Sequence, residues 1–334
     1  MAVLYVTEQG SSIYRERGML VVKKDEKVLQ EIPIAKVDKV IIVGGIFIST
    51  SALNLLLNNH IFTSFITIDG RYKGSFFSGF SKNIDLRLKQ FEKFYDEKFK
   101  ERLSKVLILN KIKNLYSFLL KHKRNNPNAE MDDELSRIKN IINKLKIVQD
   151  IRIPQLLGVE GMAARYYFKA FGKIIKNEFT FTKRTMYPPK DQVNSLLSLG
   201  YTLLLNEFVS LIYSNGLDPF IGFLHSTEYG RESLAVDMIE EFRFVVDSFV
   251  LKLINKKIIV KNDFIFDKSA GYYKLDDRSK KIFYDKYEDK LLTEIHEENI
   301  KRTGNYHNIF QSQVNKLSKF IDDKVESYIP FSYR

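Results

Sequence analysis

The sequence predicts an α+β protein, with a small β-rich N-terminal domain followed by a larger all-α domain. The chain of 334 residues is longer than the roughly 250–300 residues at which a single hydrophobic core stops growing. Its first 80 residues form short runs rich in Val, Ile, Leu and Tyr, whereas apolar residues from position 84 onward recur at helical spacing. We therefore expect a β-rich domain at 1–80, a linker at 81–86 and an α-helical domain at 87–334.

The N-terminal domain is expected to contain several short strands and one helix. Glycines and a charged turn separate the apolar runs, which lie at 3–6, 13–17, 19–23, 27–34, 39–43, 61–68 and 72–77. Ser49 or Thr50 can cap a helix over 51–58. Because 80 residues are too few to bury all of the domain's Val, Ile, Leu and Phe, we expect this domain to form a homodimer.

The rest of the chain is dominated by helical periodicity. Apolar residues continue at helical spacing from Ile84 to Leu120, and Asn125-Asn126-Pro127-Asn128 interrupts the pattern. Further helices are expected at 132–146, 154–175, 190–213, 231–256, 283–298 and 310–326. The segment 258–275 alternates in hydropathy, which predicts an extended excursion or a short hairpin.

The composition excludes several classes of protein. The chain has no cysteine, which excludes disulfides, thiolate zinc sites and a cysteine nucleophile. The opening MAVLYVTEQG lacks the pattern of a signal peptide. The longest apolar run, residues 40–48, is far shorter than the roughly 20 residues that a membrane span needs. We expect a soluble cytoplasmic protein that does not bind membranes.

The net charge of +12 is concentrated in one segment. Residues 81–150 hold 17 basic and 10 acidic residues, including Lys121-His122-Lys123-Arg124. A local positive field of this kind favours a polyanion such as nucleic acid. The alternative is a lysine-rich surface that is merely solvated.

Acidic residues gather on the helix expected at 231–256. His225 lies in a loop just before this helix, and Asp237, Glu240 and Glu241 fall within an arc of about 100° at the helical rotation per residue. Like charges at this spacing repel one another, and a divalent cation would convert that repulsion into attraction. Imidazole with carboxylates suits Mn²⁺ or Mg²⁺. The alternative is a solvated acidic face that pairs with nearby Arg or Lys side chains.

A further carboxylate, Glu160, lies in a stretch of small residues. Gly158, Gly161 and Ala164 are spaced three apart on one expected helix. Glycine inside a helix costs roughly 0.5–1 kcal/mol relative to alanine. The pattern predicts that another helix packs closely here, with Glu160 beside the contact, although close packing alone would explain the glycines.

Three separated motifs occur in a characteristic order: E-G-x-x-A-R at 160–165, G-F-L-H at 222–225 and E-E-F-R at 240–243. Together with Asp191-Gln192-Val193-Asn194 between them, this pattern resembles the CRISPR-associated endonuclease and integrase family of spacer acquisition, the "Cas one" proteins. The likeness covers nearly the whole chain. It implies that Glu160, His225 and Glu240 are catalytic and together bind one Mn²⁺ or Mg²⁺, with Asp237 beside the metal.

The resemblance also implies an activity and partners. Members of the family are metal-dependent DNA endonucleases that insert short DNA fragments into a CRISPR array. They pair as homodimers through their N-terminal domains and bind a small partner, "Cas two". The residues are compatible with two other functions, a stand-alone structure-specific DNA nuclease and a non-catalytic DNA-binding scaffold. Basic residues expected to bind DNA phosphates are Lys121, Lys123, Arg124, Lys183 and Arg184.

Overall fold

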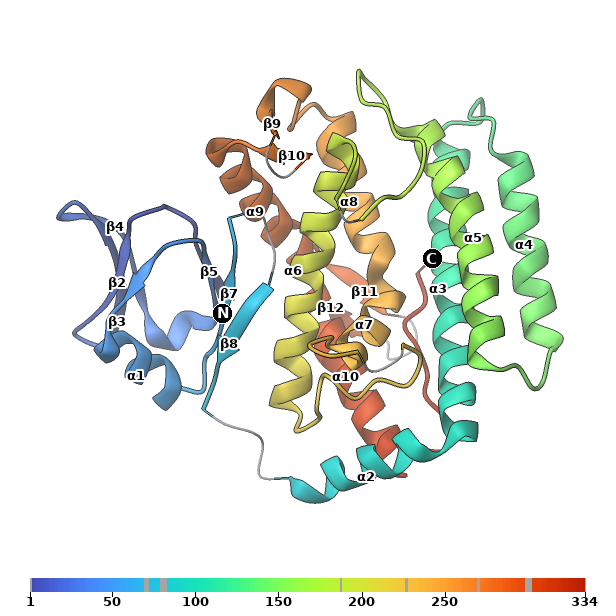
Figure 1. Ribbon diagram of the computed structural model, residues 1–334, viewed down its shortest axis with the longest axis horizontal. Helices are drawn as coiled ribbons and strands as arrows, with labels where there is room; N and C mark the ends of the chain where they lie inside the picture. The colour runs from blue at the N-terminus through green and yellow to red at the C-terminus, as the bar shows by residue number, and fades with distance from the viewer. Residues whose placement is uncertain are drawn as a thin grey trace. The chain divides into compact units, whose positions relative to one another are not determined.

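The computed structural model describes residues 2–68, 72–78, 83–186, 188–225, 228–268, 271–297 and 302–333. The chain divides into two compact units. The first comprises Met1–Phe80 with Lys280–Glu288, and the second comprises Ser81–Ser279 with Asp289–Arg334. Each unit is described by itself below (Figure 1).

Among the described residues, the first unit contains two four-stranded sheets, a helix within residues 1–80 and the helical segment Lys280–Glu288. One sheet has the order β1-β5-β7-β8, with β1 and β7 parallel to β5 and β8 antiparallel to β7. The other has the order β4-β3-β2-β6. The strands are β1 (Ala2–Val6), β2 (Ser12–Glu16), β3 (Met19–Lys24), β4 (Lys27–Pro33), β5 (Val37–Val43), β6 (Phe47–Ile48), β7 (Phe62–Ile66) and β8 (Tyr72–Phe76). A 3-10 turn, η1 (Ile34–Lys36), precedes β5, and α1 spans Thr50–Asn58.

Local sequence explains the second sheet. Two-residue turns join β2 to β3 and β3 to β4, and their central residues Arg17-Gly18 and Asp25-Glu26 all have positive φ. Positive φ at both turn residues gives the backbone twist that suits two-residue hairpins. Ser49 caps α1 by accepting a hydrogen bond from the backbone of Ala52. The predicted strands and the predicted helix of this region are confirmed.

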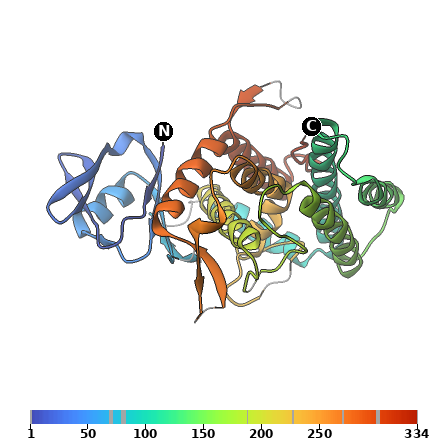
Figure 2. The same ribbon diagram turned by 90° about the horizontal axis from the view of Figure 1, so that it is seen from above.

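The second unit is mostly helical. Its longer helices are α2 (Ile84–Tyr95), α3 (Glu97–Asn125), α4 (Asp132–Ile147), α5 (Ile153–Ile174), α6 (Gln192–Ser214), α8 (Arg243–Asn255) and α10 (Tyr306–Ile321). It also holds the two ends of α9 (Asp277–Leu291), whose middle, Lys280–Glu288, belongs to the first unit. Shorter elements are α7 (Ser233–Ile239), the 3-10 turns η2 (Glu240–Phe242) and η3 (Lys261–Asp263), and the strands β9 (Phe264–Asp267), β10 (Tyr272–Leu275), β11 (Ile295–Glu297) and β12 (Arg302–Gly304). Helices α3, α4 and α5 pack against one another as a group in both views of the molecule (Figures 1 and 2).

Several predicted elements differ from the structure. The hairpin expected within 258–275 is confirmed as β9 and β10. The helix expected at 283–298 begins earlier, at Asp277, and ends at Leu291, and β11 pairs with β12 just after it. The last helix lies at Tyr306–Ile321 rather than 310–326, because Asn305 caps its start by accepting from Asn308.

The helix expected at 231–256 is interrupted. It divides into α7 and α8 at η2, which carries Glu240 and Glu241. A 3-10 turn has three residues per turn, so side chains three apart are aligned along its axis. This places Arg243 in line with Glu240, and the two form a bidentate ion pair. The prediction that Glu241 shares one acidic face with Asp237 and Glu240 is therefore wrong.

One helix among the described residues, α6, is long and apolar enough to cross a membrane by length and composition. However, 67% of its most apolar window is buried inside the protein. Asp191 caps it by accepting from the backbone of Asn194 at 2.8 Å. The burial is what we expect of a helix in the core of a soluble protein.

Candidate functional site

A cavity of about 990 Å³ opens within the helical unit. Its walls come from α3, α5, α6, the loop before α7, and the α7–η2–α8 segment. Glu160, His225 and Glu240 all line it, so the structure brings together the three residues that the family resemblance selects. Lys183 and Arg184 line it too.

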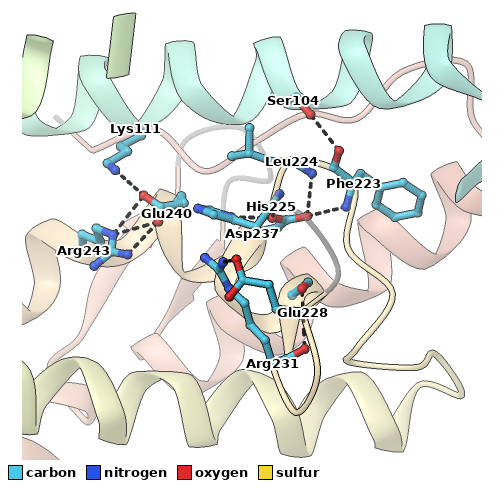
Figure 3. Close-up of polar contacts among 11 residues, drawn as sticks. Ser104, Lys111, Phe223, Leu224, His225, Glu228, Arg231, Asp237, Glu240 and Arg243 are labelled. Carbon is cyan, nitrogen blue, oxygen red and sulfur yellow. Dashed lines mark hydrogen bonds and ion pairs between the residues drawn. The ribbon is translucent and has the colours of Figure 1, made fainter. Parts of the chain in front are cut away.

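Glu160 and Glu240 meet at a buried lysine. The ammonium group of Lys111, on α3, forms ion pairs with Oε1 of Glu160 and with Oε2 of Glu240. The side chains of Lys111 and Glu240 are only 8% and 2% exposed. Arg243 also binds Glu240, with its Nε 2.9 Å from Oε2 and its Nη2 2.7 Å from Oε1 (Figure 3). Burial alone would raise the pKa of Glu240, but the positive charges of Arg243 and Lys111 outweigh it and hold the pKa well below its usual range.

His225 is held by Asp237. The Nδ1 atom of His225 lies 2.7 Å from Oδ1 of Asp237, and the imidazole ring extends between Asp237 and Glu240 (Figure 3). An ionised carboxylate only accepts hydrogen bonds, so Nδ1 donates and Nε2 of a neutral ring keeps its lone pair. Asp237 therefore fixes both the orientation and the tautomer of the ring.

Asp237 also organises the loop that carries His225. Its carboxylate accepts backbone N–H bonds from Phe223 at 2.6 Å, from Leu224 at 3.0 Å and from His225 at 3.0 Å. Gly222 makes this approach possible, because a Cβ there would lie 2.7 Å from the carbonyl carbon of Ser233 and 2.9 Å from Oδ2 of Asp237. The glycine of the G-F-L-H motif is thus required by close packing against α7.

Glu241 does not line the cavity. Its side chain is fully buried, and its carboxylate accepts from the hydroxyl of Tyr328 and, at 2.8 Å, from the backbone N–H of Phe331. Asn114 of α3 donates to the backbone oxygens of both Glu241 and Phe331. Glu241 therefore anchors the C-terminal segment against η2 and α3.

The glycines beside Glu160 have a different role from the one predicted. Gly158 and Gly161 are exposed, and a Cβ at either would meet nothing within 4 Å. The prediction that another helix packs against them is wrong, since this face of α5 is open and Gly161 lines the cavity. Of the three small residues in the pattern, Gly161 and Ala164 belong to the cavity wall.

Two residues that sequence reasoning missed are part of the cavity wall. Lys111 lies four residues after Leu107 and four before Leu115, on the buried stripe of α3. A lysine in an apolar stripe needs a buried partner, and that signal was present in the sequence. Asp247 is also buried, and the hydroxyl groups of Tyr167 and Tyr201 donate to it. Burial raises the pKa of Asp247 to about 6, against the lowering effect of the two hydroxyl groups.

The basic residues predicted to bind DNA fall into two groups. Lys183 and Arg184 line the cavity, and Arg184 donates to Oδ1 of Asn194 at 2.9 Å and to Ser198 at 3.0 Å. Lys121, Lys123 and Arg124 lie at the end of α3, outside the cavity lining. Lys123 is already engaged by Asp132 at 2.7 Å.

Comparison with known proteins identifies the family. The sequence profile described as "CRISPR associated protein Cas1" matches residues 4–289. The chain belongs to the Cas1 family. It is 33% identical to CRISPR-associated endonuclease Cas1 3 of Thermus thermophilus, over 100% of this chain and 98% of that protein.

Solved structures agree with this assignment. The Cas1 protein TM1797 from Thermotoga maritima matches with a TM-score of 0.79 and 26% identity, over 96% of this chain and 97% of that one. A chain of a Cas6-RT-Cas1–Cas2 complex matches with a TM-score of 0.84 and 24% identity, over 99% of this chain and 36% of that longer chain. At this identity the second match shows the fold alone, which is the α+β fold of Cas1 with an N-terminal β-sheet region and a mostly helical C-terminal region.

Cas1 membership implies a metal-dependent nuclease, and the donor types of Glu160, His225 and Glu240 suit a divalent cation. Carboxylate oxygens and a neutral imidazole are donors that Mn²⁺ and Mg²⁺ accept. A carboxylate behind the other ring nitrogen, as Asp237 is behind His225, is the usual support of a metal-binding histidine. Within the described part of the chain, no three His, Asp or Glu side chains are arranged as a ligand set. The oxygens of Glu240 instead face Lys111 and Arg243.

Proposed function

We propose that this Cas1-family protein is a metal-dependent DNA endonuclease and integrase. It would insert short DNA fragments into a CRISPR array by attack of a 3′-hydroxyl on a phosphodiester. The observation that carries the proposal is the convergence of Glu160 and Glu240 on one ammonium group in the wall of a cavity that His225 also lines. Two carboxylates that share one cationic partner are already positioned around a single centre of positive charge.

Each residue of this group has a distinct task. Glu160, His225 and Glu240 would hold one Mn²⁺ or Mg²⁺, which supplies Lewis-acid stabilisation of the negative charge that develops at the attacked phosphate. Asp237 keeps the Nε2 lone pair of His225 available by accepting from Nδ1. Arg243 fixes the rotamer of Glu240 through its bidentate contact. We expect this arrangement to lose little entropy when the nucleic acid binds, since the side chains are already ordered.

The charge of the cavity suits a polyanion. Among the described residues, seven Lys or Arg side chains and five Asp or Glu side chains line it. Contacts between such basic side chains and the phosphates of a nucleic acid would provide affinity that does not depend on the base sequence. Tyr229 stands fully exposed in the loop at the cavity, and an exposed aromatic ring offers a surface on which a nucleic-acid base can stack. The site therefore suits a DNA end or junction better than a small neutral substrate.

The same proposal covers the assembly. The protein would act in the cytoplasm as a homodimer joined through residues 1–80, in complex with Cas2. Exposed apolar side chains on the first unit, Val28 and Leu29 on β4 and Phe47 on β6, support an interface there, because contact with a partner would remove their apolar surface from water.

A joining assay tests the function. The protein is incubated with Mn²⁺, a short duplex and a supercoiled array plasmid, with and without Cas2, and joined products are quantified. Glu240→Gln is the control, because it removes one proposed ligand while leaving a side chain of the same shape. Cleavage of branched DNA with no joining in the presence of Cas2 would favour a stand-alone nuclease. DNA binding with neither reaction would favour a non-catalytic scaffold.

A further inference from the structure

Lys111 occupies the position at which the two proposed carboxylate ligands meet. Its ammonium group contacts Glu160 on α5 and Glu240 on η2, and these residues come from segments 49 and 129 positions further along the chain. We propose that Lys111 is an internal counter-ion that competes with the divalent cation for Glu160 and Glu240. The inference rests on the metal site of the proposed function and adds a residue that controls its occupancy.

Charge balance supports this competition. Two carboxylates, one ammonium and one guanidinium leave the group formed by Glu160, Glu240, Lys111 and Arg243 electrically neutral. A divalent cation on the same oxygens would add two positive charges in a largely buried place, where charges interact more strongly than in water. The ammonium group of Lys111 and the cation cannot both contact the same carboxylate oxygens at low cost. Metal binding therefore requires Lys111 to move.

Lys111 is better suited to move than Arg243. The guanidinium of Arg243 makes a planar, bidentate contact with Glu240 and lies over the ring of Tyr201, 4.8 Å from its centroid. Lysine carries a point charge on a flexible four-carbon chain, and Lys111 borders the open cavity. Once released, its ammonium group can contact a phosphate there. Arg243 would stay on Glu240 in both states.

This mechanism links metal binding to nucleic acid. Without a polyanion, the cation would enter a cavity wall in which positive groups already outnumber negative ones. A phosphate group in the cavity offsets the added charge and offers Lys111 a new partner. By linkage, the nucleic acid should raise the affinity for Mn²⁺, and Mn²⁺ should raise the affinity for nucleic acid by the same factor.

The first test is a calorimetric titration with Mn²⁺ in the absence of nucleic acid. Lys111→Met should bind Mn²⁺ at least about tenfold more tightly than the wild type, because the competing charge is gone. Lys113→Met is the matched control. Lys113 lies on the same helix as Lys111 and, among the described residues, makes no ion pair. Its substitution removes the same charge. It should leave the affinity unchanged.

Glu240→Gln separates the two proposals. If it binds Mn²⁺ as well as the wild type does, the metal site itself is misplaced and the proposed function fails with it. If Glu240→Gln loses Mn²⁺ binding while Lys111→Met binds Mn²⁺ no more tightly than the wild type, the proposal that Lys111 competes with the cation is wrong and the metal site stands. A short DNA duplex should also tighten Mn²⁺ binding more in the wild type than in Lys111→Met.

A second measurement uses the wild-type chain, so it does not depend on how the variant folds. Lysine acetylation by acetic anhydride is followed by mass spectrometry, with and without saturating Mn²⁺. Lys111 should be protected without metal and should become reactive with it, while the labelling of Lys113 stays constant. Protection of Lys111 that persists when Mn²⁺ binding is demonstrated by a rise in Tm would overturn the proposal.

Discussion

Glu240 and Glu241 are adjacent in the chain, yet their carboxylates have separate partners on separate sides of one 3-10 turn. Glu240 faces the cavity, where Lys111 and Arg243 bind it. Glu241 faces the C-terminal segment and accepts from Tyr328 and Phe331. Spacing on a regular helix would place both on one acidic face, and the turn at 240–242 separates them.

This relationship predicts opposite phenotypes for two neighbouring substitutions. Glu240→Gln should abolish Mn²⁺-dependent cleavage and joining while the fold and the DNA affinity are kept. Glu241→Gln should retain joining at permissive temperature but lower stability by about 1–3 kcal/mol, because the NH₂ group that replaces one carboxylate oxygen cannot accept from the buried donor facing it. Joining rates at saturating Mn²⁺ and urea unfolding measure the two effects. An inactive Glu241→Gln beside an active Glu240→Gln would contradict the assignment.

A second prediction ranks the other residues of the site. Glu160→Gln and His225→Ala should each abolish metal-dependent cleavage and joining, with DNA affinity unchanged. Asp237→Asn should lower the joining rate by about 10–100-fold, the usual cost of losing a group that supports a metal ligand. It should also lower the Tm, since Asp237 accepts three backbone N–H groups of the loop that carries His225.

The measurements that check this ranking are joining rates and melting temperatures on the same preparations. His225→Ala should lower the Tm less than Asp237→Asn does, because among the described residues the His225 side chain makes a single hydrogen bond, to Asp237. A larger loss of activity in Asp237→Asn than in His225→Ala would reverse the proposed roles.

Much of the fold could be predicted because its signals are local. The strands of the first unit follow apolar runs between positive-φ turns such as Arg17-Gly18, and Ser49 and Asp191 are ordinary helix caps. The residues Glu160, His225 and Glu240 could be selected from their motifs. Their convergence on one cavity depends on tertiary packing and was reached only through the family resemblance.

The features that the sequence missed depend on distant contacts. The break in the helix at 240–242 coincides with bonds from Lys111 and Asn114 on α3, and the local sequence carries no Gly or Pro that would indicate it. The environment of Asp247 depends on Tyr167 and Tyr201, which are 80 and 46 residues away. Small residues spaced along a helix, such as Gly158 and Gly161, occur both at helix contacts and on open faces, so local sequence does not distinguish the two.

The third prediction concerns pH and Asp247, whose pKa burial raises to about 6 from 3.8. Between about pH 4 and pH 6 the folded state holds a proton that the unfolded state has lost, so the free energy of unfolding falls as the pH rises through this window. Above the window this group adds no further pH dependence. The Asp247→Asn variant has no ionisable group at this position. Its free energy of unfolding, relative to that of the wild type, should therefore rise by about 3 kcal/mol between pH 4 and pH 7.

Urea unfolding at a series of pH values checks the effect of Asp247. Tyr201→Phe is a useful companion, because the Tyr201 hydroxyl donates to Asp247 and lowers its pKa. Loss of this hydroxyl should raise the pKa of Asp247 further, so the free energy of unfolding should continue to fall up to a higher pH. If the free energies of unfolding of the wild type and Asp247→Asn change in parallel with pH, the assignment of the fall between about pH 4 and pH 6 to Asp247 is wrong.

The fourth prediction concerns the homodimer. Strand β4 lies at the end of its sheet and exposes Val28 and Leu29 by 43% and 44%. Changing both to Glu should weaken self-association without unfolding the chain, as measured by sedimentation. Ile147→Glu is the control, since Ile147 is also exposed but lies on α4 of the helical unit. Residues 86–334 expressed alone should sediment as a monomer, and a dimer of that fragment would contradict the prediction.

The last prediction separates the basic residues at the end of α3 by their existing partners. Lys121 and Arg124 are exposed, whereas Lys123 donates to Asp132 at 2.7 Å and to the backbone oxygen of Ala129 at 2.8 Å. Each phosphate contact that is lost flattens the slope of log K against log salt by about 0.9 for duplex DNA. Replacing Lys121 and Arg124 with Gln should therefore reduce the slope by about 2 and weaken binding evenly across sequences. Lys123→Gln should leave the slope nearly unchanged, because its ammonium group is already engaged. If the double variant keeps the wild-type slope, this end of α3 is a solvated surface, and the phosphates are bound at the cavity by residues such as Lys183 instead.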